Sequence, residues 1–94
     1  MAKATRAADV RRFRDIPNVG PATEGDLRLL GIDTPAALAG QDAYALYDRL
    51  CAITGVRHDP CVIDVFLAIV DFMEGAPPRP WWDYTEARKQ ATGG

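Results

Sequence analysis

The sequence predicts an all-α fold, a single compact domain of about five helices that takes in residues 1–94. Apolar residues recur at helical spacing in several segments, and proline or glycine stands between these segments as a start or stop signal. No run of alternating apolar and polar residues is long enough to predict a strand. The length of 94 residues fits one small domain and excludes large barrels and doubly wound dinucleotide-binding folds.

Two helices and a tight turn are predicted in the N-terminal third of the chain. The first helix covers residues 6–15, and Pro17 ends it because proline disfavours helical geometry in the residue before it. The second covers residues 21–30, with a proline at its first position, where no N–H is needed, and Gly20 as its N-cap. Gly31 follows as a natural left-handed C-cap.

Two longer helices form the predicted core. The first spans residues 42–54, and the second spans residues 60–74 and carries the widest apolar stripe, which indicates a central position. A short helical turn at residues 35–39 precedes them. Residues 76–84 form a stiff, proline-rich strap that ends in two tryptophans and is expected to cover the central helix. A short amphiphilic segment at 85–90 follows the strap.

The net charge of −2 hides an uneven distribution along the chain. Residues 1–14 hold five bases and one acid, whereas residues 15–94 hold six bases and twelve acids. This balance argues against a general polyanion binder, but it leaves room for one focused contact near the N-terminus. Two cysteines, no signal-peptide pattern and no apolar stretch of bilayer length together predict a cytoplasmic protein with no membrane partner.

The turn at residues 17–21 carries the candidate chemistry. A tight turn leading into a helix exposes backbone N–H groups that have no intrahelical partner, and the helix dipole favours an anion beside them. Gly20 would let a phosphate approach closely, while the side chain of Val19 is expected to pack inward between the two helices. The candidate amide donors are Asn18, Val19, Gly20, Ala22 and Thr23. The candidate supporting cations are Arg11, Arg14 and Arg28, with Lys3 as a further base.

Two carboxylates in the first turns of the second predicted helix, Glu24 and Asp26, oppose a bound phosphate, although acids also suit a helix N-terminus for structural reasons. Two functions therefore stay open. In the first, the chain binds the DNA backbone weakly and without sequence specificity. In the second, it is a protein–protein interaction module that retains the fold without binding DNA.

A family resemblance rests on the same segment. Residues 16–23, followed by Leu30-Gly31-Ile32, resemble a helix-hairpin-helix motif (residues 6–32), which is known mainly as a sequence-independent binder of the DNA backbone. Asn18 stands where that motif usually has its first glycine, and asparagine tolerates the left-handed geometry that the position needs.

The longer span from 16 to 89 resembles the small helix-hairpin-helix proteins known as pathogenicity locus proteins, some of which carry a mitomycin-resistance name. The matching residues are 16–23, 26–32, 50–51, 54–62, 64–66 and 80–82. The resemblance implies a fold and a DNA-related role, with an expected link to DNA damage or drug resistance. It implies no defined activity.

A Cys-x6-His-x2-Cys array could supply three zinc ligands from Cys51, His58 and Cys61. Its spacing fits no specific zinc module, and a fourth ligand would have to be Asp59 or Asp64. We expect instead that the cysteines are small buried residues on adjacent helices and that the histidine is satisfied locally. No nucleophile or carboxylate pair accompanies the histidine, so the sequence predicts a non-enzymatic protein without metal or cofactor.

The aromatic residues after the strap have two interpretations. Trp81, Trp82 and Tyr84 could stack unpaired bases, as aromatic residues do in single-strand binders. We expect them to serve instead as a cover for the central helix, with one tryptophan at the surface. Lys3 and Arg6 are expected to lie on a solvated, frayed end.

Overall fold

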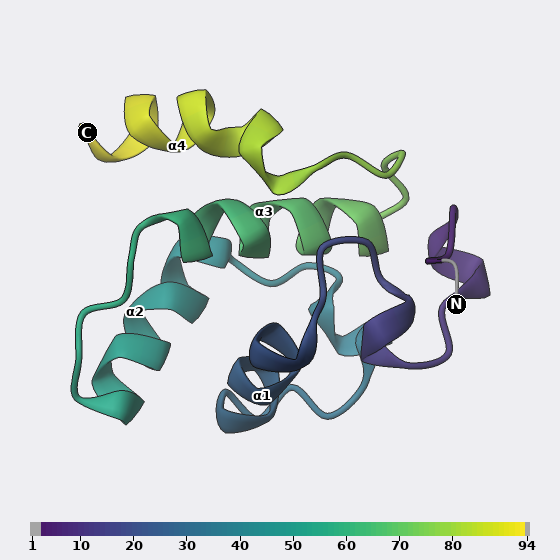
Figure 1. Ribbon diagram of the computed structural model, residues 1–94, viewed down its shortest axis with the longest axis horizontal. Coiled ribbons are helices and arrows are strands. Elements are labelled where there is room, and N and C mark those ends of the chain that lie inside the picture. The colour runs from purple at the N-terminus through teal and green to yellow at the C-terminus, as the bar shows by residue number, and fades with distance from the viewer. Residues whose placement is uncertain (1–2, 94) are drawn as a thin grey trace.

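The structure of the protein, a computed structural model, describes residues 3–93 (Figure 1). These residues contain four α-helices and no strand, so the predicted all-α class is confirmed. The α-helices are α1 (Pro21–Leu29), α2 (Ala43–Thr54), α3 (Cys61–Met73) and α4 (Thr85–Thr92). Short 3-10 turns lie at Ala7–Asp9, Phe13–Asp15, Pro35–Leu38 and Trp81–Tyr84.

Helix α3 is the centre of the molecule, as its wide apolar stripe predicts. Figure 1 shows it between α4 on one side and α1 and α2 on the other. Phe66 and Ile69 are fully buried at its middle, and Leu50 of α2 is fully buried against the same core. The Trp81–Tyr84 turn packs along α3, which confirms the predicted cover.

The predicted helix at residues 6–15 is wrong. Two 3-10 turns stand there instead, and the backbone at Val10 and Arg12 is extended. The Asp15 carboxylate accepts hydrogen bonds from the backbone N–H groups of Arg11 and Arg12 at 3.0 and 2.9 Å. A side chain that binds nearby amides in this way competes with helical hydrogen bonding. The helix count is therefore four rather than five in residues 3–93.

The other predicted start and stop signals are largely confirmed. Gly20 is the N-cap of α1, and Gly31 beyond its end has a left-handed φ of +78°. The Asp42 carboxylate accepts from two amides at the start of α2. The start of α3 differs slightly, because the helix begins at Cys61 while the Asp59 carboxylate accepts from the Cys61 N–H at 2.8 Å.

A buried ion pair fixes α4 on α3. Asp64, on the most apolar helix of the chain, is completely buried, and its Oδ1 lies 2.9 Å from Nε of Arg88. Thr85 Oγ1 donates to Oδ2 of the same carboxylate at 2.8 Å. Asp64, which the sequence offered as a fourth zinc ligand, here anchors the C-terminal helix.

Candidate nucleic-acid interface

The turn at residues 16–20, here named the 16–20 turn, is held from inside. Val19 is 1% exposed, which confirms the predicted inward packing of its side chain. Its N–H donates to the Ile16 carbonyl at 3.1 Å, so the Val19 amide is not an open donor as the sequence analysis supposed. Asn18 has a left-handed φ of +76°, a conformation that asparagine tolerates better than most residues.

Three amides at the start of α1 are open. The N–H groups of Gly20, Ala22 and Thr23 donate no hydrogen bond to any residue from 3 to 93. The first helical bond of α1 runs from the Glu24 N–H to the Gly20 carbonyl at 3.0 Å. A Cβ added at Gly20 would meet no atom within 4 Å. Open amides at a helix N-terminus, where the dipole is positive, are suited to an anion.

The first of the two opposing carboxylates binds two of the candidate cations. Nε of Arg14 lies 2.9 Å from Oε1 of Glu24, and Nη2 of Arg28 lies 3.1 Å from Oε2. These hydrogen bonds hold the pKa of the Glu24 carboxyl below its ordinary value. Glu24 is therefore charged at neutral pH and neutralises part of the positive field of both arginines, whose side chains are more than half exposed.

The second carboxylate has different surroundings. Burial raises the pKa of Asp26, and the nearby His58 acts in the opposite direction. Asp26 forms no ion pair with any residue from 3 to 93, so its surroundings differ from those of Glu24, although only two positions separate the two acids.

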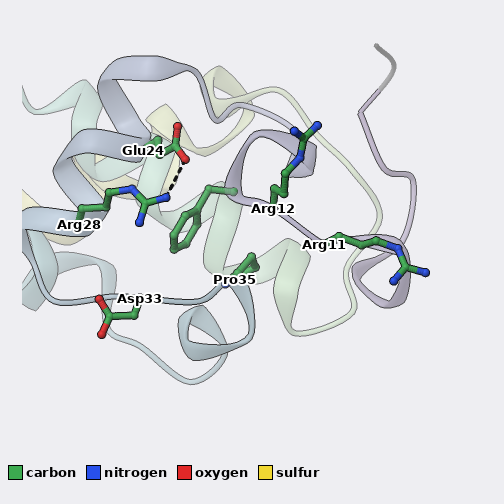
Figure 2. A pocket seen from close by; sticks show the side chains of 7 residues that line it. Arg11, Arg12, Glu24, Arg28, Asp33 and Pro35 are labelled. Carbon is green, nitrogen blue, oxygen red and sulfur yellow. Dashed lines mark hydrogen bonds and ion pairs between the residues drawn. The ribbon is translucent and has the colours of Figure 1, made fainter.

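A shallow hollow lies next to the Glu24 cluster and encloses about 200 Å³. Its lining residues are Arg11, Arg12, Phe13, Glu24, Arg28, Asp33 and Pro35. Figure 2 shows Arg28 reaching Glu24, whereas the guanidinium groups of Arg11 and Arg12 point away from it. The Arg28 guanidinium also lies 5.5 Å from the centre of the Phe13 ring, a cation–π contact. Arg11 thus lines the same hollow as Arg28, but its guanidinium does not point toward Glu24.

The N-terminal bases divide in a way that the sequence analysis did not foresee. The Lys3 ammonium donates to the backbone carbonyls of Arg14 and Val19, and the Ala4 N–H donates to the Asp15 carbonyl at 2.8 Å. Lys3 is therefore docked on the 16–20 turn rather than frayed. Arg6 forms only an exposed pair with Asp9 at 3.4 Å, the solvated arrangement that was expected.

The Asn18 side chain joins the 16–20 turn to the strap. Its Nδ2 donates to the Arg79 carbonyl at 2.8 Å, and its Oδ1 accepts from the Trp81 N–H at 3.1 Å. More than sixty residues separate these partners in the chain, so no local sequence signal predicted the contact. Trp82, next to this junction, is 62% exposed.

The remaining candidates have local partners. Oγ1 of Thr54 lies 2.8 Å from Nε2 of His58, and the His58 N–H donates to Sγ of Cys51. Burial and the neighbouring Asp59 raise the pKa of the Cys61 thiol. Among the described residues, no three histidine, cysteine or acidic side chains form a group that could hold a metal ion. Within the same range, no helix has the length and apolarity needed to cross a bilayer.

Comparisons with known proteins place the chain in a family. The family model described as "Pathogenicity locus" matches residues 6–90, a span that includes the 16–20 turn, the Glu24 cluster and the strap. "Mitomycin resistance protein McrB" of Streptomyces lavendulae is 42% identical over 88 residues, which cover 94% of this chain and 84% of that protein. No solved structure matches significantly. The chain therefore belongs to the pathogenicity locus family.

Proposed function

We propose that the protein is a non-enzymatic binder of the DNA backbone that contacts phosphate without reading sequence, in the manner of a helix-hairpin-helix. The observation that carries this proposal is the set of open amides at Gly20, Ala22 and Thr23, with Arg14 and Arg28 beside them. Two 3-10 turns stand in place of the first helix of such a motif. The docked Lys3 and the buried Val19 support the 16–20 turn in place of that first helix.

Phosphate would compete with Glu24 for the two arginines. An ion pair between exposed side chains in water contributes little to stability, because solvent screens it. Arginine binds phosphate with charge-assisted hydrogen bonds, so Arg14 and Arg28 can exchange the carboxylate for a phosphate at small cost. The amides then supply neutral donors to the same anion. This exchange makes Glu24 a competitor that weakens DNA binding.

The expected affinity is low, micromolar or weaker, because one turn on a chain of net charge −2 contacts few phosphates. A partner protein or a second copy would add contacts and raise the affinity. The name of the relative, a mitomycin resistance protein, supports a role in drug resistance.

Substitution of Gly20 tests the proposal. Gly20→Glu places a carboxylate at the open amides, and Gly20→Ala is the matched neutral control. Both fit the backbone, because φ is −110° and an added Cβ meets nothing within 4 Å. Fluorescence anisotropy of labelled single-stranded, duplex and branched DNA at low salt is the measurement. We expect Gly20→Ala to bind like the wild type and Gly20→Glu to lose binding to every DNA, with the same circular dichroism spectrum.

The neutralisation of Arg14 and Arg28 by Glu24 favours a second candidate, a protein–protein interaction module. Leu29, on the same helix, is 54% exposed and would suit such a contact. This function predicts that the wild type binds none of the DNAs at high micromolar protein. Arg28→Glu would then leave the anisotropy of the labelled DNA unchanged. DNA-backbone binding predicts instead that Arg28→Glu abolishes an anisotropy increase that the wild type produces.

A further inference from the structure

Trp82 is a large aromatic side chain that the fold leaves in solvent. Of the three aromatic side chains in residues 81–84, Trp81 is half-buried, and its ring stands nearly perpendicular to that of Trp82, with 5.6 Å between the centroids. The Tyr84 hydroxyl donates to the Asp71 carboxylate at 2.8 Å. Burial and this carboxylate raise the pKa of Tyr84 to about 12. Trp82 alone among the three is 62% exposed.

The Asn18 side chain fixes the position of this tryptophan relative to the 16–20 turn. Because Oδ1 of Asn18 accepts from the Trp81 N–H at 3.1 Å, covalent geometry limits the distance between the Cα atoms of Asn18 and Trp82 to about 12 Å. The second bond, to the Arg79 carbonyl, holds the strap on both sides of Pro80. Pro80 has the extended backbone of a stiff polyproline segment, so the strap does not swing freely.

We propose that Trp82 stacks on an unpaired base and thereby gives the DNA site a preference for single-stranded over duplex DNA. The inference rests on the proposed function, because phosphate bound at the Gly20 amides delivers the strand to the strap. Base–aromatic stacking tolerates any sequence, since every base has a π-face. In a duplex those faces are covered by neighbouring bases, so the exposed indole gains nothing there without unstacking a pair.

The test compares Trp82→Ala with Trp82→Phe on a short oligothymidylate and on a duplex of equal length. Fluorescence anisotropy gives both dissociation constants for each variant. We expect Trp82→Ala to weaken single-strand binding about ten-fold, the loss of one stacked base, and to leave duplex binding unchanged. Trp82→Phe retains an aromatic face and should keep most of the preference. Val56→Ala is the control for loss of another exposed apolar side chain.

Asn18→Gly tests the link between the two regions. Glycine adopts the left-handed φ of this position without strain and removes both hydrogen bonds to the strap. We expect the preference for single strands to fall in this variant while binding to duplex DNA persists. A preference that stays at the wild-type value would mean that Asn18 does not place Trp82.

The outcomes separate this inference from the proposed function. Suppose that Trp82→Ala weakens binding to both DNAs equally, or to neither, while Gly20→Glu abolishes binding. That result would overturn stacking by Trp82 and leave phosphate binding at α1 in place. If the wild type binds no DNA at all, both are overturned together. As a second readout, Trp81→Phe leaves Trp82 as the single tryptophan, and stacking should quench its fluorescence on addition of oligothymidylate.

Discussion

Two charge clusters in this protein have the same chemistry and opposite surroundings. Asp64 and Arg88, between α3 and α4, have side chains that are 0% and 8% exposed. Glu24 lies between Arg14 and Arg28 beside the 16–20 turn, and the two arginine side chains are 51% and 60% exposed. The distances from carboxylate to nitrogen are alike, 2.9 Å in the first cluster and 2.9 and 3.1 Å in the second.

Burial determines whether an ion pair is a fixed part of the fold or can be exchanged for another partner. Water cannot replace a lost partner inside the protein, so the buried pair must stay intact and acts as an anchor for α4. Water or another anion can replace Glu24 at the surface, so the exposed pairs are exchangeable. Charge in the C-terminal half of the fold therefore holds α4 in place, whereas the charges beside the 16–20 turn are exposed and exchangeable.

The largest expected effect is on stability, from Asp64→Ala. The variant leaves Arg88 in the interior without its carboxylate and removes the acceptor for Thr85. We expect a loss of about 3 kcal/mol in the free energy of unfolding. For a domain of this size, the midpoint of thermal unfolding should fall by roughly 15 °C. Circular dichroism melting and urea titration measure both quantities.

The double variant Asp64→Leu with Arg88→Met is the matched control for that loss. Replacing both members of a buried pair with apolar residues of similar size removes the uncompensated charge. It should therefore melt well above Asp64→Ala. If the single and double variants melt together, the anchoring role assigned to the ion pair is contradicted.

A smaller effect, on DNA affinity rather than on stability, is expected from Glu24→Gln. Glutamine keeps the size of the side chain and one of its two acceptor oxygens, and it removes the charge that competes with phosphate for Arg14 and Arg28. We expect DNA affinity to rise about five-fold at low salt, the effect of one like charge a few ångströms from a phosphate in water. Fluorescence anisotropy measures it on the same DNAs.

Asp26→Asn is the charge-matched control for Glu24→Gln. It removes one negative charge from the same helix, but at a carboxylate that forms no ion pair with Arg14 or Arg28. We expect its DNA affinity to stay at the wild-type value. Equal increases in DNA affinity in the two variants would show that net charge alone controls binding and that Glu24 does not compete with phosphate for Arg14 and Arg28.

Elements whose bounds depend on interactions between residues close in sequence were predicted correctly. Helices α1, α2 and α3 begin and end at prolines, glycines and an aspartate cap that act within a few residues, so their bounds were predictable. The segment at 6–15 failed because the Asp15 carboxylate binds the amides of Arg11 and Arg12, which composition does not show.

The candidate site was predictable to a similar extent. The turn and the open amides at the start of α1 follow from residues that are close in sequence. The Asn18 bonds to the strap and the Asp64–Arg88 pair join residues far apart in the chain. An aspartate on an apolar helix and an arginine near the C-terminus carry no local sign that they meet.

The most direct test of phosphate binding by the 16–20 turn is the salt dependence of duplex binding by the wild-type protein. If about three phosphates are contacted, a plot of log affinity against log salt concentration has a slope of about −2.7. The affinity then falls roughly forty-fold between about 50 and about 200 mM salt. A flat plot, or no binding at the lowest salt with high micromolar protein, would contradict phosphate binding by the 16–20 turn.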